Sequence, residues 1–366
     1  MIEDSQVTPE VLARAETPRG VRADADVCRV CGNAAGNHAY HAREMFAGTR
    51  EPFTYVECAA CGTLQLRDVP DLARYYSGDY YSLTAIADVD ERAGLSAMRR
   101  LARSLGARAR RGVAAYYCAR RATLGAARHP IGWLASRALK RYARDFPAYL
   151  KDAAYHLKLD LNSAVLDVGS GAGTTLLLLS QFGFRDLTGI DPFLDADISY
   201  PSGVRVLKAE LCDLSRQFDL ILANHSVEHV SDPRETLKEI RRLLKAGRYA
   251  IVRIPVAARA WQLYGADWVQ LDPPRHLHLF TAAKFRALAE DEGFGVDEVR
   301  HDSTAFQFWG SEQYVRDIPL SDARSYLVNP EASVFSREQI ARWEDEAAHL
   351  NARGEGDQAI FYLRKR

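Results

Sequence analysis

The sequence lacks any long apolar run. Its densest one, from Leu176 to Leu179, is far shorter than the roughly 20 residues that cross a membrane. The N-terminus lacks the apolar stretch of a secretory signal and carries acidic residues where such a signal has lysines. A strong net charge is missing too, because 48 Lys and Arg balance 48 Asp and Glu. These absences predict a cytoplasmic protein, and a hydrophobic share of 47% predicts a full-sized core.

The balanced total hides one strongly basic segment. Residues 91–151 contain fifteen Lys or Arg but only two acidic residues. The apolar residues there recur at helical spacing in two stripes: Leu95, Met98, Leu101 and Leu105, then Ile131, Leu134, Ala138 and Tyr142. The pattern predicts basic amphipathic helices. They suit an anionic lipid surface at the inner face of the membrane, a lid or dimer face with a solvated charged side, or a nucleic acid.

Six cysteines in a cytoplasmic protein argue against a disulfide framework. Four of them form two Cys-x-x-Cys-Gly motifs, Cys28 with Cys31 and Cys58 with Cys61. Each motif presents two sulfurs from one tight turn, and two such turns complete a tetrahedral zinc site without an open position. We therefore predict structural Zn²⁺ in a zinc-ribbon-like module. The alternative is a pair of thiol turns without metal, but the polar segment between them is too short to form its own core.

A glycine-rich loop follows an apolar strand in the middle of the chain. The run AVLDVGSGAG begins at Ala164 and ends in Gly169, Gly171 and Gly173. Alternating glycines let a backbone pass close to a ligand at the carboxyl end of the strand. A second strand ends at Asp191, and a third ends just before Glu210.

Two further strands and a helix complete this pattern. Residues 218–223 read as a buried strand, Asp232 and Pro233 as a helix start, and residues 249–254 as the next strand. From Leu157 to Val299 the chain resembles the class I S-adenosylmethionine (SAM)-dependent methyltransferases. The resemblance implies an α/β fold with a Rossmann-like seven-stranded sheet, whose last strand is residues 358–363.

The resemblance also implies a set of SAM-binding residues. Asp167 would organise the amino-acid end of SAM, Asp191 its ribose hydroxyls and Glu210 its adenine amino group. The remaining positions are the three loop glycines and Asn224, at the end of the fourth strand. For each acid, the alternative is a solvated turn residue.

Two polar clusters are the candidates for catalysis. In this fold the turn after the fourth strand faces the methyl group, and here it carries His225, Glu228 and His229. A later segment carries His276 and His278, whose alternate spacing places both on one face of an extended chain. Such residues could provide the base that a hydroxyl acceptor needs. They could equally support packing or order a loop.

The order of these parts is similar to that of bacterial methyltransferases of surface-glycan and deoxysugar biosynthesis. Sugar C-methyltransferases share the paired cysteines, a tyrosine-rich stretch after the second pair and the Glu-His pair. That resemblance implies Glu228 and His229 near a sugar, and Tyr76 or Tyr80 near a nucleotide. Ser226 replaces a tyrosine of those enzymes, and their additional C-terminal domain is missing here. Both departures favour O-methylation of a sugar, nucleotide sugar or glycan, which could be lipid-linked.

We predict four parts and keep two competing functions open. The parts are a flexible N-terminus (1–24), the zinc module (25–70), an aromatic and basic helical region (71–155), and the methyltransferase domain (156–366) with an insertion at 302–356. The first competitor is an RNA methyltransferase, against which the missing (D/N)PP(Y/F) motif argues. The second is a non-catalytic scaffold, against which the intact glycines argue. An oligomer is compatible with all of these functions.

Overall fold

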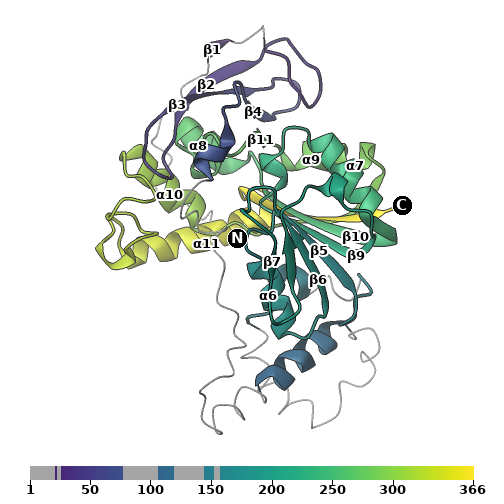
Figure 1. The fold of residues 1–366 in the computed structure, drawn as a ribbon. Helices are drawn as coiled ribbons and strands as arrows, with labels where there is room; N and C mark the ends of the chain where they lie inside the picture. Colours follow the sequence, from purple (N-terminus) through teal and green to yellow (C-terminus); the bar gives the residue numbers. More distant parts are fainter. Residues whose placement is uncertain (1–20, 23–25, 77–105, 119–143, 152–156) are drawn as a thin grey trace, which may run out of the picture.

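The larger sheet forms the centre of the molecule (Figure 1). The computed structural model describes residues 21–22, 26–76, 106–118, 144–151 and 157–366. The strands of the larger sheet are, in spatial order, β12 (Phe294–His301), β13 (Gln358–Lys365), β10 (Leu244–Pro255), β9 (Phe218–Asn224), β5 (Ala164–Val168), β6 (Asp186–Ile190), β8 (Arg205–Leu207) and β7 (Ile198–Ser199).

Five of these strands run parallel, and their order sets the position of the site. β10, β9, β5, β6 and β8 are parallel neighbours, whereas β13 is antiparallel to both β10 and β12. The chain leaves β5 for β6 on one side and later enters β9 on the other. Open α/β sheets bind ligands where the strand order reverses in this way, at the carboxyl ends.

The predicted strands are present, but the count of seven is wrong. The described sheet has eight strands, because the two-residue strand β7 pairs antiparallel with β8 at the edge. Its sequence is too short for a strand pattern to appear.

Helices cover both faces of the sheet. α7 (Pro233–Leu243) and α9 (Ala282–Asp291) pack in one apolar cluster, and α6 (Thr174–Gln181), α4 (Ala148–Lys151) and a helical segment at 106–118 pack in another. Asp232 caps α7 as predicted, by accepting hydrogen bonds from the Arg234 and Glu235 backbone N–H groups. From the sequence, Gly247 is the residue expected to stop this helix, but the helix already ends at Leu243. Leu244 is already extended and pairs with Phe218, and Gly247, with φ of 68°, lies in the irregular start of β10.

A second sheet lies above the carboxyl edge of the first (Figure 1). Its strands are, in order, β1 (Val21–Arg22), β2 (His38–Arg43), β3 (Pro52–Glu57), β4 (Leu64–Leu66) and β11 (His278–Leu279). β11 comes from the distant segment between β10 and α9, so this sheet is completed by a strand of the predicted methyltransferase domain. η1 (Leu72–Tyr75) follows β4.

The insertion shares a core with this second sheet. It contains α10 (Phe306–Val315), η6 (Pro330–Ala332) and α11 (Arg337–Arg353), and it packs with α8 (Arg259–Tyr264), η4 (Gly265–Asp267) and η5 (Val269–Leu271). Buried aromatic residues from all three regions meet there, among them Tyr55, Trp268 and Trp343. The N-terminal strands, the segment after β10 and the insertion therefore form one lobe over the sheet edge. The predicted domain limits stay a prediction.

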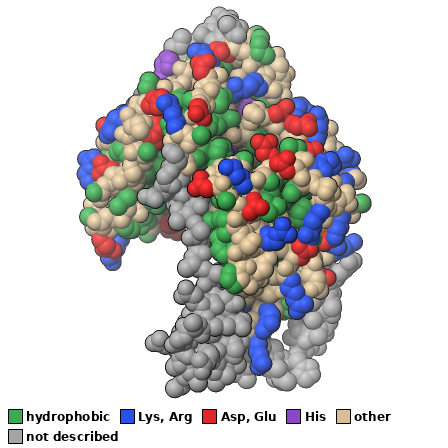
Figure 2. All heavy atoms as spheres, in the orientation of Figure 1, with side chains coloured by type: hydrophobic (Ala, Val, Ile, Leu, Met, Phe, Trp, Pro, Cys, Tyr) green, Lys and Arg blue, Asp and Glu red, His purple; other side chains and the backbone are tan. Residues whose placement is uncertain are grey.

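Several predictions concern residues outside the described part. These are most of the N-terminus, Tyr80, and both apolar stripes of the basic segment. On the face shown in Figure 2, acidic and basic side chains are interspersed rather than separated. Among the described helices, none is long and apolar enough to cross a membrane.

Candidate functional site

The loop after β5 depends on its three glycines. Gly169, Gly171 and Gly173 have φ values of 68°, 52° and 90°, the left-handed region that other residues rarely adopt. A Cβ on Gly173 would lie 2.8 Å from a methyl carbon of Val206. The loop can therefore follow this path only with glycine.

Asp191 joins the end of β6 to this loop. Its Oδ2 accepts a hydrogen bond from the Gly171 backbone N–H (2.9 Å), and its Oδ1 accepts one from Phe193 (3.0 Å). Burial raises the pKa of Asp191, although these two bonds oppose the shift. The carboxylate is thereby fixed at the carboxyl edge of the sheet.

Asp167 lies on β5 close to Asp191. Burial, reinforced by repulsion from Asp191, raises the pKa of Asp167 to about 7. Two neighbouring carboxylates with raised pKa values form a site whose charge a cation would stabilise. The sequence predicted both residues from their place at strand ends, and the structure brings them together.

The other two predicted cofactor residues lie at neighbouring strand ends. Asn224 ends β9, where its Nδ2 donates to the Tyr149 hydroxyl (3.4 Å). Its Oδ1 is buried and has no hydrogen-bond partner among the described residues. Glu210 is exposed just before η2 (Leu211–Asp213), so its position is compatible with a ligand or with solvent.

The turn after β9 carries a buried acid between two histidines. η3 (Val227–His229) contains Glu228, whose side chain is fully buried. Its Oε1 lies 3.2 Å from His225 Nδ1, whereas its Oε2 lacks a partner among the described residues. Burial alone would raise the pKa of Glu228, but the His225 hydrogen bond and the nearby His229 lower it overall.

His225 is oriented by a basic residue that the sequence analysis missed. Arg253 on β10 donates to His225 Nε2 (3.1 Å) and, through its Nε, to Asp302 (2.7 Å). Since a guanidinium can only donate, His225 Nε2 is the acceptor and its Nδ1–H points to Glu228. A charged residue inside the apolar run of residues 250–254 was the available signal for Arg253.

The rings of His229 and His276 are in edge-to-face contact. Their centroids are 4.8 Å apart. His229 Nδ1 lies 2.8 Å from the Arg275 carbonyl oxygen and 2.9 Å from the Tyr76 hydroxyl. His276 Nδ1 lies 2.7 Å from the Gln270 carbonyl oxygen, and burial lowers the pKa of His276 to about 4.

His278 lies apart from this cluster. Its Nδ1 is 3.2 Å from the Val230 carbonyl oxygen, and its ring stacks on Phe280. Burial lowers the pKa of His278 to about 4. Both predicted histidines therefore contact the segment that follows β9, but only His276 joins Glu228 and His229.

Tyr76 contacts both the turn after β9 and the segment after β6. Its ring stacks on Phe193, two residues after Asp191, with centroids 4.4 Å apart. Its hydroxyl reaches His229. Tyr76 was predicted near a nucleotide, whereas Phe193 was missed because nothing in its sequence context distinguishes it from a packed residue.

Arg275 is a buried charged residue. Only 2% of its side chain is accessible, and it forms ion pairs with Asp272 and Glu44. It also lies over the Phe46 ring, with its guanidinium carbon 4.4 Å from the ring centroid. Arg275 thus fixes the segment whose carbonyl orients His229.

The four predicted metal ligands form one cluster. A sulfur from each of Cys28, Cys31, Cys58 and Cys61 lies within 4.8 Å of the others. Two of the sulfur pairs are 3.8 and 3.5 Å apart, close to the about 3.8 Å edge of a tetrahedron with zinc–sulfur bonds of about 2.3 Å. The two turns are matched, because the Gly32 and Gly62 N–H groups each donate to the first cysteine's carbonyl. These residues fit a zinc ion.

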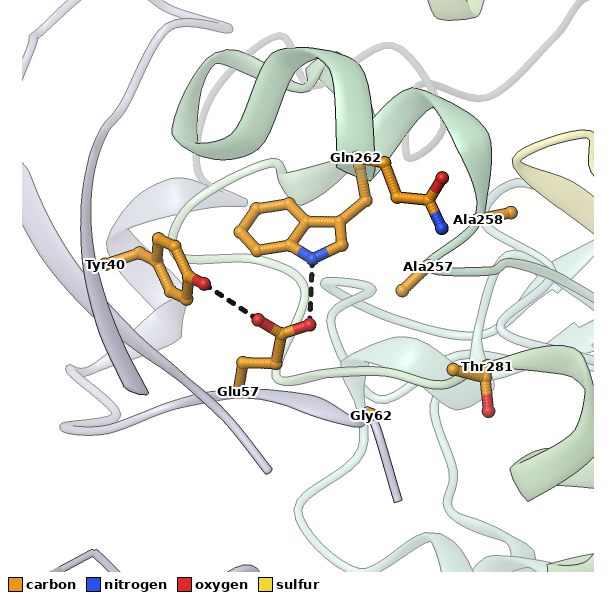
Figure 3. A pocket seen from close by; sticks show the side chains of 8 residues that line it. Tyr40, Glu57, Gly62, Ala257, Ala258, Gln262 and Thr281 are labelled. Carbon is orange, nitrogen blue, oxygen red and sulfur yellow. Dashed lines mark hydrogen bonds between the residues drawn. The ribbon is translucent and has the colours of Figure 1, made fainter. Parts of the chain in front are cut away.

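A separate cavity of about 450 Å³ lies between the second sheet and α8 (Figure 3). Glu57 projects into the region drawn and accepts hydrogen bonds from the Tyr40 hydroxyl and Trp261 Nε1. Its lining residues include none of the predicted cofactor or catalytic residues. The cavity therefore does not mark the site assembled above.

Comparisons with known proteins find a family match that includes the glycine loop and the turn after β9. A family model described as a methyltransferase domain matches residues 135–299. The chain is similar to the ubiquinone biosynthesis O-methyltransferase of Azorhizobium caulinodans, with 29% identity over 152 residues, 37% of this chain and 60% of that protein. It is also similar to that of Bradyrhizobium diazoefficiens, with 33% identity over 128 residues, 31% of this chain and 49% of that one.

The solved structures are more distant. Mycolic acid cyclopropane synthase CmaA1, complexed with SAH and CTAB, aligns with a TM-score of 0.41 and 17% identity, covering 62% of this chain and 85% of that one. The cyclopropane synthase MmaA2 from Mycobacterium tuberculosis aligns with a TM-score of 0.37 and 16% identity, covering 60% of this chain and 86% of that one. The chain spans about 60% of the length of the first curated relative.

Proposed function

We propose that this chain, which contains a SAM-dependent methyltransferase domain, transfers the methyl group of SAM to a hydroxyl oxygen of a sugar or glycan. The proposal depends on one observation: two groups of polar residues lie at the same edge of the larger sheet. The Asp167–Asp191 pair and the Glu228–His229–His276 cluster both lie at the carboxyl ends of the parallel strands.

The cofactor side suits a positively charged ligand. SAM supplies a methyl group on a cationic sulfonium and also carries an ammonium group. The open backbone of the glycine loop would lie along it, Asp191 would accept its ribose hydroxyls, and Asp167 would face its amino-acid end. Asn224, with its buried carbonyl oxygen, and Glu210 are the remaining proposed contacts.

The acceptor side suits a hydroxyl. An alcohol becomes a good nucleophile only when its proton is removed or its developing charge is stabilised. Glu228, His229 and His276 provide an anionic oxygen and two imidazoles beside the proposed position of the methyl group. His225 directs its Nδ1–H to Glu228, and His278 contacts the Val230 carbonyl outside this cluster, so both would act by supporting the turn.

We also propose a zinc ion at the four cysteines, with a structural role only. Four sulfurs leave no open position on zinc, so its role would be to hold the second sheet together. β11 is part of that sheet, and the Leu277 N–H just before it donates to the Glu228 carbonyl (2.7 Å). The ion would therefore stabilise the segment that packs against the Glu228–His229 turn.

The acceptor class rests on the parts outside the family match. The N-terminal strands and the insertion form the lobe over the site, and both lie outside residues 135–299. The combination of a paired-cysteine module, Tyr76 and a Glu-His pair resembles enzymes that methylate sugars. A second candidate acceptor is a precursor of ubiquinone, because the curated relatives carry that name. Membrane contact through residues 91–151 and self-association stay predictions.

Calorimetric titration with SAM tests the cofactor part of the proposal. We expect binding by the wild type and its loss in Asp191→Ala. Asp186→Ala is the matched control, because Asp186 lies at the opposite end of the same strand and pairs with surface Arg216. A folded wild type that does not bind SAM would overturn the proposal and favour a scaffold.

Methyl transfer from labelled SAM then tests the acceptor. Nucleotide sugars, lipid-linked glycans and ubiquinone precursors would be compared at equal concentration, with RNA as a fourth substrate. Label on a sugar oxygen supports the proposal. Label only on the quinone precursor or only on RNA replaces it with that alternative.

A further inference from the structure

Glu228, His229 and His276 bring three potential metal ligands to one point. A ligand atom from each lies within 4.8 Å of those of the other two. Glu228 and His276 are buried, and His229 is half-buried. The ligands come from two segments, η3 and the chain just before β11, that the fold holds together through the Leu277–Glu228 backbone hydrogen bond.

The hydrogen bonds of both histidines leave one nitrogen as an acceptor. A carbonyl oxygen can only accept, so the Nδ1 atoms of His229 and His276 carry the protons that they donate to Arg275 and Gln270. Each Nε2 atom of the neutral rings therefore has a lone pair, and that of His276 lies 3.8 Å from an Asp272 carboxylate oxygen. Histidines that bind metals are typically oriented in this way, by a backbone carbonyl on the second nitrogen.

Glu228 supplies the negative charge. Its Oε2 is buried and, among the described residues, has no hydrogen-bond partner. A buried carboxylate oxygen without a partner is costly, and a cation in front of it would remove that cost. His225 occupies the other oxygen, so Oε2 is the atom that remains for a ligand.

We propose that Glu228, His229 and His276 bind a divalent transition-metal ion that coordinates the acceptor hydroxyl. This inference rests on the proposed function. Two imidazoles and one carboxylate suit Zn²⁺, Mn²⁺, Fe²⁺ or Co²⁺ better than Ca²⁺ or Mg²⁺ and leave open positions for an oxygen ligand. Ligands at about 2.1 Å from one ion lie about 3 to 3.5 Å apart, so small side-chain rotations would close the site.

The ion would prepare the acceptor for methyl transfer. Coordination lowers the pKa of an alcohol, which then releases its proton to water. The resulting alkoxide oxygen forms a bond to the methyl carbon while the bond between that carbon and the sulfonium breaks. The products are a methyl ether and S-adenosylhomocysteine, and the metal ion is unchanged.

Mn²⁺ is the probe that separates this site from the cysteine site. It stands at the weak end of the divalent series, so it does not displace zinc from four thiolates. Full-length protein with its zinc bound would be titrated with Mn²⁺ and followed by electron paramagnetic resonance. We expect one Mn²⁺ bound per chain, and its loss in Glu228→Gln and in His276→Gln.

The controls separate a binding site from a folding defect. His41→Ala removes an exposed imidazole on β2 and should keep the Mn²⁺ site. Thermal unfolding of each variant shows whether it is folded. Absence of Mn²⁺ binding by the wild type, or equal binding by the folded Glu228→Gln variant, would overturn the metal site.

SAM titration of the same samples separates this inference from the proposed function. SAM binding without any Mn²⁺ binding would refute the metal site and leave the methyltransferase proposal intact. Mn²⁺ binding without SAM binding would refute the proposed function while the metal site stands.

Discussion

Gly169 and Ser226 are packed directly against each other. A Cβ on Gly169 would lie only 2.7 Å from the Ser226 Cβ. Gly169 begins the loop after β5, and Ser226 begins the turn that contains Glu228 and His229. The buried Ser226 hydroxyl has no hydrogen-bond partner among the described residues. The loop after β5 and the turn after β9 are therefore in direct contact at a position where only glycine fits.

Gly169→Ala should disturb both halves of the site. The left-handed backbone alone costs about 1 to 2 kcal/mol with a side chain. Contact with Ser226 adds overpacking, which typically costs about 1 to 3 kcal/mol. We expect lower stability in urea unfolding and lower SAM affinity by calorimetry.

Gly203→Ala is the control for this substitution. Gly203 also has a positive φ, of 89°, but a Cβ there would meet no atom within 4 Å. It should show the backbone cost alone and keep SAM binding. Equal effects of the two substitutions would refute the coupling between loop and turn.

Asp167 should make stability depend on pH in the direction opposite to a salt-bridged acid. Its pKa of about 7 in the folded protein is above its unfolded value near 3.8. The folded state therefore binds the extra proton between these values, and stability falls as the pH rises through this window. Asp167→Asn should be more stable than the wild type at pH 8 or so, and the difference should shrink toward about pH 4.

Unfolding free energies in urea at several pH values check this sign. The same variant should bind SAM more weakly, because it loses a carboxylate facing the cationic ligand. An Asp167→Asn variant that is less stable than the wild type at about pH 8, with the gap closing toward low pH, would show that Asp167 is stabilised as the anion, contrary to its burial.

The sequence predicted the sheet better than the lobe above it. Strand ends carry their own signals, such as the glycines after β5 and the acid after β6, and these were placed correctly. The two-residue strand β7 has no pattern to detect. β11 is also two residues long, and it joins a sheet whose other strands are more than 200 residues away in the chain.

In the candidate site, too, local sequence patterns predicted some residues, whereas tertiary packing decides the others. The Glu228–His229 turn could be found from local sequence, and His276 could be proposed from its neighbours. That His276 rather than His278 joins the turn depends on tertiary packing between two segments. The ion pair of Arg275 with Glu44 also depends on tertiary packing, because the two residues are 231 positions apart in the chain.

Arg253→Gln should reduce catalysis without reducing SAM affinity. The guanidinium fixes the His225 tautomer, so its loss frees the ring that holds Glu228. Loss of such an orienting partner typically costs about 10- to 100-fold in activity. With an accepted substrate, kcat should fall by that amount while the SAM dissociation constant changes little.

Arg300→Gln provides the comparison for Arg253→Gln. Arg300 lies on β12 and pairs with Glu298 on the surface, where an ion pair contributes little. Its kcat should match that of the wild type. A parallel loss in both variants would mean that a general change of charge, rather than the orientation of His225, explains the effect.

Cys61→Ser should weaken binding of the proposed zinc ion and loosen the second sheet above the site. Three thiolates hold zinc more weakly than four, and a structural zinc site contributes on the order of 10 kcal/mol to folding. Cys61 also contacts the methyltransferase domain, since its carbonyl lies within reach of the Thr281 hydroxyl that caps α9. We expect metal analysis to show less than one zinc per chain and thermal unfolding to begin earlier.

SAM binding should persist, because Asp167 and Asp191 belong to the larger sheet, whereas methyl transfer should be lost with the ordering of β11. Cys212→Ser, at an exposed thiol, should keep zinc, stability and activity. Full zinc content in folded Cys61→Ser would show that the four sulfurs are not its ligands.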